Sequence, residues 1–120
     1  MIARTWHGRV PSVKADAYET YLHRTGLADI AATPGNRGVL LLRRTEDDVT
    51  HFLLTSFWDS VESIRQFAGD DYARARYYEE DDAFLLEREA LVTHHDVVVA
   101  TAFEGVDAPR PRRIERSQPA

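Results

Sequence analysis

The stretch FLLTSFWDSVESIRQFAG, residues 52–69, decides how this chain folds. Its first half is rich in aromatic and aliphatic residues and is typical of a strand that ends at Trp58. Asp59 follows as a candidate N-cap, and Glu62 stands three residues later, which is the spacing of a capping box. Apolar residues then recur at helical spacing until Gly69, a stop signal. A strand is therefore expected to pass directly into a helix, with a tryptophan at the junction.

Upstream of this stretch, the sequence predicts one more strand and one more helix. Residues 2–10 alternate like a strand, and Pro11 ends it because its ring removes a hydrogen-bond donor. From about Val13 to Leu27, apolar residues recur four apart and form one stripe, with Gly26 near its end. This region is expected to be the first helix.

The remaining strands follow from turn signals and short apolar runs. Turn residues crowd positions 32–38, and the apolar run at 39–44 suits a strand. A polar turn at 45–48 leads into the strand at 50–58, so these two strands are expected to pair antiparallel. A last strand is expected at 90–103. The order is βαββαβ.

That order in a short chain predicts an α+β, ferredoxin-like fold: a four-stranded antiparallel sheet with both helices on one face. Alternate residues of the last strand are largely apolar on both sides, so both faces of the sheet are expected to be covered. Helices are available for one face only. A homodimer packed sheet to sheet is the expected cover for the other face.

Composition narrows the class of protein. The chain has 120 residues and no cysteine, which excludes disulfides, thiolate metal sites and a cysteine nucleophile. The formal net charge is −5, and residues 107–120 carry +2 through four Arg, one Asp and one Glu, so residues 1–106 carry −7. An acidic domain argues against nucleic-acid binding. We expect a domain at 1–102, a flexible Pro- and Arg-rich tail at 103–120, no membrane span and a cytoplasmic location.

Four segments resemble one family, the antibiotic biosynthesis monooxygenase group of the dimeric α/β barrel superfamily. They are MIARTWHG (1–8), TPGNRG (33–38), FLLTSFWDSVESIRQFAG (52–69) and YYEEDDAFLL (77–86), and the resemblance covers about residues 1–102. The superfamily includes cofactor-free oxygenases, haem-degrading enzymes, isomerases and cyclases, so the resemblance says more about fold than about activity. It implies that Trp58 lines a cavity between sheet and helices, whereas the sequence without the resemblance favours a core or interface tryptophan.

The residues that such a cavity would use are mostly aromatic. Rings supply stacking for a flat ligand, and a few polar groups orient it. The expected substrate-binding residues are Trp58, Trp6, Phe67, Tyr72, Tyr77, Tyr78 and His94. His51 or His7 is the candidate base, because histidine titrates nearest neutral pH, and Asn36 or a tyrosine hydroxyl is the candidate to bind a developing oxyanion.

Two other patterns are interpreted as structural. His94 and His95 are neighbours on a strand and point to opposite faces, so they cannot chelate one metal together, although a site formed by His7, His51 and one of them stays open. A short helix is expected over 70–77, and the carboxylates of YYEEDD (77–82) are expected to be solvated. No bound metal is predicted.

The leading functional hypothesis is a cofactor-independent monooxygenase that uses O₂ on a polycyclic phenol. The substrate would supply the electrons, while the protein would orient it and exclude water. A haem-binding or haem-degrading monooxygenase is the alternative; the superfamily uses the Trp58 equivalent, an Asn on the first strand and a His after the second helix. Here the first strand offers Thr5, Trp6 and His7, and the later segment offers tyrosines. A non-catalytic small-molecule binding or dimerisation module is the third hypothesis.

Overall fold

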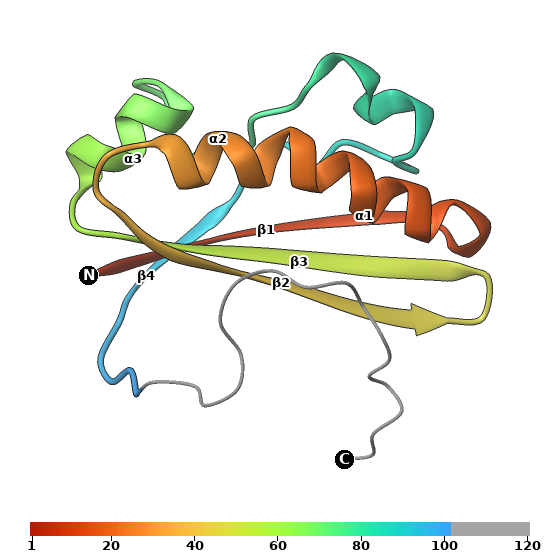
Figure 1. The fold of residues 1–120 in the computed structure, drawn as a ribbon, viewed down its shortest axis with the longest axis horizontal. Helices are drawn as coiled ribbons and strands as arrows, with labels where there is room; N and C mark the ends of the chain where they lie inside the picture. The colour runs from red at the N-terminus through yellow and green to blue at the C-terminus, as the bar shows by residue number, and fades with distance from the viewer. Residues whose placement is uncertain (102–120) are drawn as a thin grey trace.

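The computed structural model describes residues 1–101, and in them one antiparallel sheet carries all three helices on a single face (Figure 1). The strand order is β2-β3-β1-β4. The strands are β1 (Ile2–Pro11), β2 (Asn36–Glu46), β3 (Val49–Trp58) and β4 (Thr93–Asp96). The helices are α1 (Ala15–Arg24), α2 (Gly26–Ala32) and α3 (Val61–Ala68), with short 3₁₀ turns η1 (Ser12–Lys14) and η2 (Glu79–Ala83). The predicted ferredoxin-like α+β fold is confirmed.

The two central strands show why the sheet has one covered face. Along β3, every second residue from Thr50 to Trp58 is buried, and the residues between them are partly or largely exposed. The neighbouring strand β1 follows the same rule from Arg4 to Val10, with Trp6 and Val10 buried and His7 half-buried. Side chains on a strand alternate between faces, so the buried set faces the helices. None of the helices described for residues 1–101 is long and apolar enough to cross a bilayer.

The first helical region is two helices, not the single helix predicted from Val13 to Leu27. It breaks at Thr25, whose φ of −117° and ψ of −93° are not helical. The Tyr21 carbonyl, in the last turn of α1, accepts from both the backbone N–H and the hydroxyl of Thr25, at 3.1 Å and 2.8 Å. Gly26 therefore begins α2 and does not end a helix. The second piece places Ile30 in the core, 2% exposed.

The start of α3 also differs from the prediction by one residue. Ser60 is the N-cap, and its Oγ accepts a hydrogen bond from the backbone N–H of Ser63 at 3.2 Å. Asp59 instead pairs with Arg37 at 2.9 Å, so the expected Asp59–Glu62 capping box is wrong. Gly69, with φ 90°, ends α3 as expected.

The tight approach of the 33–38 turn to this helix requires a glycine. Gly35 has φ 90°, and a Cβ built on it would lie 1.9 Å from the hydroxyl of Ser63. Its carbonyl accepts from the backbone N–H of Asp59 at 2.9 Å. The turn and the β3–α3 junction are therefore locked together.

The last strand, predicted at 90–103, starts later because residues just before it pair elsewhere, and it ends at Asp96, which pairs with Ile2 at the start of β1; residues 102–103 lie outside the described residues. Leu91 bridges Arg74, and the backbones of Ala75 and Val92 bond to those of Ala90 and Ala73 at 2.9 Å each. Segment 70–92 therefore folds back on itself over one edge of the sheet, and the short helix expected at 70–77 does not form. The predicted tail at 103–120 lies outside the described residues.

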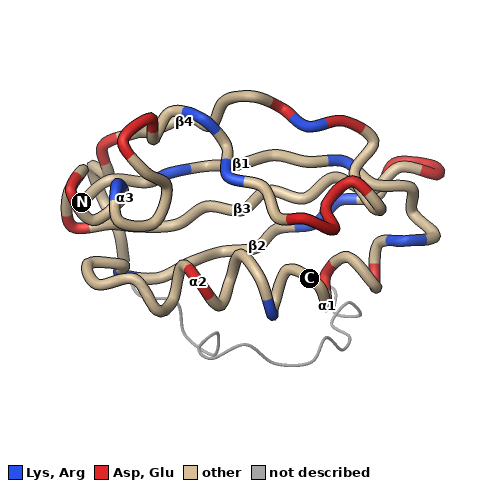
Figure 2. Tube along the Cα trace, turned by 90° about the horizontal axis from the view of Figure 1, so that it is seen from above, with Lys and Arg blue, Asp and Glu red and all other residues tan. Residues whose placement is uncertain are grey.

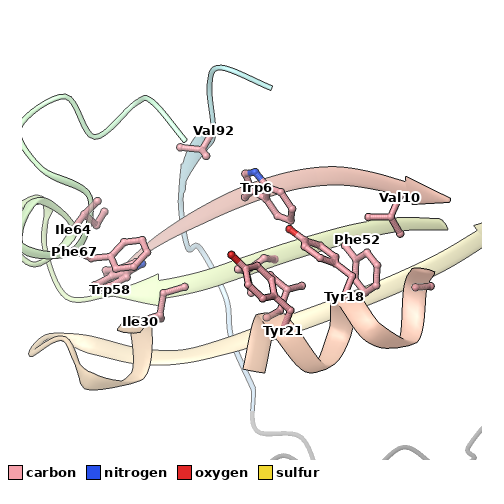
Figure 3. Close-up of a cluster of buried hydrophobic side chains, with 13 residues drawn as sticks. Trp6, Val10, Tyr18, Tyr21, Ile30, Phe52, Trp58, Ile64, Phe67 and Val92 are labelled. Atoms are coloured by element: carbon pink, nitrogen blue, oxygen red, sulfur yellow. The ribbon is translucent and has the colours of Figure 1, made fainter. Parts of the chain in front are cut away.

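Figure 3 shows the buried cluster between the sheet and the helices. Trp58 lies beside Phe67 and Ile64 at one end, and Trp6 lies farther along β1 with the aromatic rings of Tyr18 and Phe52 nearby. Segment 70–92 contributes partly buried rings at its margin. The two tryptophans thus occupy different parts of one core.

Candidate functional site

A cavity of about 40 Å³ lies where segment 70–92 covers the helix face of the sheet. Aromatic rings form much of its wall, with two arginines and one carboxylate among them. The lining residues are Arg4, Trp6, Tyr18, Leu22, Ile30, Leu54, Ser56, Phe67, Arg76, Tyr77, Tyr78 and Asp81. Pockets that hold drug-sized ligands are usually at least about 300 Å³. A flat aromatic ligand therefore enters only if the covering segment moves outward.

Arg4 is the most unusual residue of this cavity. It is 5% exposed and stands on the buried side of β1, two residues before Trp6. One guanidinium nitrogen, Nη2, donates to the Arg74 carbonyl at 3.0 Å, whereas Nε has no partner among the described residues. Across residues 1–101, no carboxylate forms an ion pair with Arg4. Burial, followed by repulsion from Arg76, lowers the pKa of Arg4 to about 10.

A second cation lies close to the first. The guanidinium carbons of Arg76 and Arg4 lie 4.8 Å and 5.5 Å from the centroid of the Phe67 ring. Arg76 also donates to the Phe67 carbonyl at 2.8 Å and contacts Asp29 at 3.4 Å. The two arginines give this part of the cavity a positive potential in a region of low dielectric.

Asp81 is buried, which corrects the expectation that the carboxylates of residues 77–82 are all solvated. It is 3% exposed; its Oδ1 accepts from the Tyr18 hydroxyl at 3.0 Å, and its Oδ2 accepts from the Tyr78 backbone N–H at 2.6 Å. Burial, reinforced by Asp81, raises the pKa of Tyr18 well above its usual range. Tyr18 is thus a neutral donor, and Asp81 is the acidic group of the cavity.

The other two cavity tyrosines are held neutral in the same way. The Tyr77 hydroxyl donates to the Glu89 carbonyl at 2.7 Å and accepts from Trp6 Nε1 at 3.1 Å. The Tyr78 hydroxyl donates to Asp29 at 2.6 Å. Burial raises the pKa of both phenols.

The structure brings only some of the predicted substrate-binding residues together. Trp6, Phe67, Tyr77 and Tyr78 line the cavity. Trp58 does not: it is fully buried, its Nε1 donates to Ser56 Oγ at 2.8 Å, and its ring stacks on Phe67. The expected cavity wall is therefore a core residue one layer behind the lining.

Tyr72 and His94 lie together near the cavity but outside its lining. Their rings meet edge to face with centroids 5.3 Å apart, and Arg4 is the residue paired with His94 across the sheet. Burial, followed by repulsion from Arg4, lowers the pKa of His94. The pKa of His94 therefore depends on the charge of Arg4, although His94 does not line the cavity.

The three predicted catalytic residues lie away from this cavity. His7 and His51 are on the opposite face of the sheet, where His7 Nε2 lies 3.0 Å from His51 Nδ1 and His7 Nδ1 lies 2.5 Å from Glu89 Oε2. Asn36 binds only backbone groups: its side chain contacts the Phe57 carbonyl at 3.0 Å and both polar groups of Gly38. The expected proximity of His7 and His51 is present, but neither histidine reaches the aromatic cavity. No group of three metal-ligating side chains is present within residues 1–101.

Sequence reasoning missed Arg4, Arg76, Tyr18 and Asp81. One signal was available for Arg4, because it shares the strand parity of Trp6 and so had to stand on the buried face. The same parity puts His7 on the face opposite Trp6. For Asp81 no local signal exists, since Tyr18, which binds it, is 63 residues away in the sequence.

No protein-family model matches the chain, and no curated protein matches it. Solved structures with the same fold include two of MhuD. A point mutant of MhuD, crystallised with two manganese protoporphyrin IX molecules per active site, has a TM-score of 0.58 at 18% identity and covers 86% of this chain and 100% of that one. The haem-degrader MhuD from Mycobacterium tuberculosis, with two haems in its active site, has a TM-score of 0.56 at 19% identity and covers 85% and 100%.

Proposed function

We propose that this chain binds a flat aromatic small molecule between the sheet and segment 70–92 and oxygenates it without a bound cofactor. One observation carries the proposal: Trp6, Phe67 and Tyr77 surround a cavity that also holds buried charges. Stacked rings orient a planar ligand, and few polar groups are needed to fix its position. Membership of the antibiotic biosynthesis monooxygenase group is part of the same proposal and is supported by the fold.

The chain's own residues would bind, orient and shield the substrate. In such a reaction a phenol of the anthrone type loses a proton and gives electrons to O₂; its ring CH₂ becomes a carbonyl, and the second oxygen atom leaves as water. Within the cavity, Asp81 is the carboxylate that can accept the proton, while the covering segment excludes water. His7 and His51 are not assigned this role because they lie on the other face of the sheet.

Haem is the second candidate ligand, because both similar structures carry porphyrins in their active sites. The aromatic wall and the guanidiniums of Arg4 and Arg76 suit a porphyrin plane and its carboxylates. The donor set does not suit iron: the lining contains no His, Cys or Met, and its tyrosine hydroxyls each donate a hydrogen bond and are held neutral. Haem is therefore assigned no role in the proposed reaction.

One set of titrations separates these candidates. The protein as purified is titrated with haemin, with metal-free protoporphyrin and with an anthrone, while the Soret region, tryptophan emission and O₂ consumption are recorded. We expect emission quenching by the anthrone together with O₂ uptake, and no shifted Soret band of a ligated iron. Saturable haemin binding with such a band, and no response to the anthrone, would replace the oxygenase with the haem protein. Binding without turnover would leave a non-catalytic binding module.

A homodimer through the open face of the sheet belongs to this proposal. All three helices lie on the other face (Figure 1), and the open face carries Leu42 and Leu53, which are 50% and 38% exposed. Leu40 and Phe57 are partly exposed beside them. Exposed apolar side chains gathered on one sheet face favour association with a second subunit.

The charged residues do not gather in the same way. Figure 2 shows acidic and basic residues interleaved along the described trace, without a basic stripe.

A further inference from the structure

We propose that Arg4 is the anion-binding residue of the cavity and that the ligand is an aromatic oxyanion, a carboxylate or a phenolate attached to a flat ring. This inference rests on the proposed function and names the chemical class of its substrate. The geometry behind it is the side chain of Arg4, buried at the cavity and without a carboxylate partner among residues 1–101.

The strand parity fixes where this charge stands. Arg4 follows Ile2 and precedes Trp6 on the helix face of β1, so its guanidinium enters the core and not the solvent. Removing a guanidinium from water is costly, and buried charges in proteins are normally paired or fully hydrogen-bonded. Arg4 is neither, because its Nε has no partner within the described chain.

A purely structural role explains only part of the arrangement. Nη2 of Arg4 donates to the carbonyls of Arg74 at 3.0 Å and Tyr72 at 3.5 Å, which ties the covering segment to β1. A neutral donor would serve that purpose equally well and at a lower desolvation cost. Two features remain: the free Nε–H and a positive charge that Arg76 reinforces instead of neutralising.

The surroundings select an anion that carries a ring. The Phe67 ring lies under both guanidiniums, and Trp6 lines the same cavity. Asp81 does not supply the missing charge, because its oxygens accept from Tyr18 and Tyr78 and form no ion pair with Arg4. A carboxylate or phenolate placed at Nε would accept a charge-assisted hydrogen bond while its ring stacked on the aromatic wall.

The test compares ligands with the same ring and different charge. Full-length protein is titrated with 2-naphthoate, 2-naphthol and 2-naphthamide, and tryptophan emission reports binding because Trp6 lines the cavity. We expect naphthoate to bind at least tenfold more tightly than naphthamide. For naphthol, affinity should rise as the pH approaches its own ionisation, which distinguishes a phenolate site from a carboxylate site.

Variants assign the preference to Arg4. Arg4→Met keeps a long apolar stem and should bind naphthoate and naphthamide equally, whereas Arg4→Lys should restore part of the preference. Arg37→Met is the matched control, because it removes an exposed arginine that pairs with Asp59 and does not line the cavity, and it should keep the full preference. Retention of the full preference in a folded Arg4→Met variant would overturn the assignment.

A second measurement on the wild-type protein holds even if Arg4→Met fails to fold. His94 is the residue paired with Arg4 across β1 and β4, and burial, followed by repulsion from Arg4, lowers the pKa of His94. An anion bound at Arg4 should therefore move the NMR titration of His94 upward, and naphthamide should not. Equal affinity of the wild type for naphthoate and naphthamide would refute the proposal that the ligand is an oxyanion, whereas the proposal of an aromatic-binding site would stand. Failure of every naphthalene compound to bind would refute the proposed function as well.

Discussion

Replacing Trp58 by phenylalanine tests whether this residue belongs to the core or to the ligand site. Its indole is fully buried, donates to Ser56 Oγ at 2.8 Å and stacks on Phe67 with centroids 5.9 Å apart. Phenylalanine is smaller by roughly 40 Å³, which costs about 1 kcal/mol at about 24 cal/mol per Å³ of cavity. Loss of the buried hydrogen bond adds about 1 kcal/mol. We expect the free energy of unfolding to fall by about 2 kcal/mol.

The assay is urea unfolding followed by circular dichroism, with thermal unfolding as a second measure. For a domain of about 100 residues, 1 kcal/mol corresponds to about 4 °C or somewhat more, so the melting temperature should fall by about 8 °C. Affinity for an aromatic ligand should change less than twofold, because Trp58 does not line the cavity.

Trp6→Phe is the matched control. Trp6 lines the cavity and donates to the Tyr77 hydroxyl at 3.1 Å, so this variant should weaken ligand binding several-fold. The reasoning is refuted if Trp58→Phe keeps its stability and loses affinity, because Trp58 would then contact the ligand directly.

Three further predictions concern the cap, the pH dependence and the open face. Ser60→Ala should lower the free energy of unfolding by about 1 kcal/mol, whereas Asp59→Ala, which removes only an exposed ion pair, should lower it much less. If urea unfolding gave the reverse order, Asp59 and not Ser60 would be the N-cap. His94 has a folded pKa below its ordinary value of 6.5, so the stability it contributes is complete above pH 6.5 and is lost as the pH falls through the folded pKa. Between pH 8 and pH 5, the melting temperature should therefore change less in His94→Gln than in the wild type. The same pH dependence in both proteins would contradict this. Leu53→Glu, on the open face, should halve the mass measured by light scattering, whereas a wild-type monomer at micromolar concentration would remove the dimer from the proposal.

Local errors in the predicted elements share a cause. The break at Thr25 lies in a region whose apolar stripe continues on both sides, and the piece after it packs Ile30 into the core. The last strand begins later than predicted because Leu91 pairs with Arg74 and not with β1. In both places the spacing of apolar residues is compatible with the expected element. Where the element actually breaks or begins depends on contacts that this spacing does not reveal.

The sequence by itself determined the sheet, its buried face and the β3–α3 junction. Alternation in β1 and β3 needs only nearest neighbours to specify which side chains are buried. The same alternation puts Arg4 on the face of Trp6 and His7 on the other face, a signal that the predicted catalytic site did not use. The tertiary structure alone decided what covers that face. Segment 70–92 shows no regular apolar period in its sequence, and its residues are held by partners far away in the chain. Arg4, 70 residues earlier, binds the Arg74 carbonyl, and Tyr18, 63 residues earlier, binds Asp81. Periodicity selects a face, but only long-range contacts select the segment that closes it and the charges enclosed there.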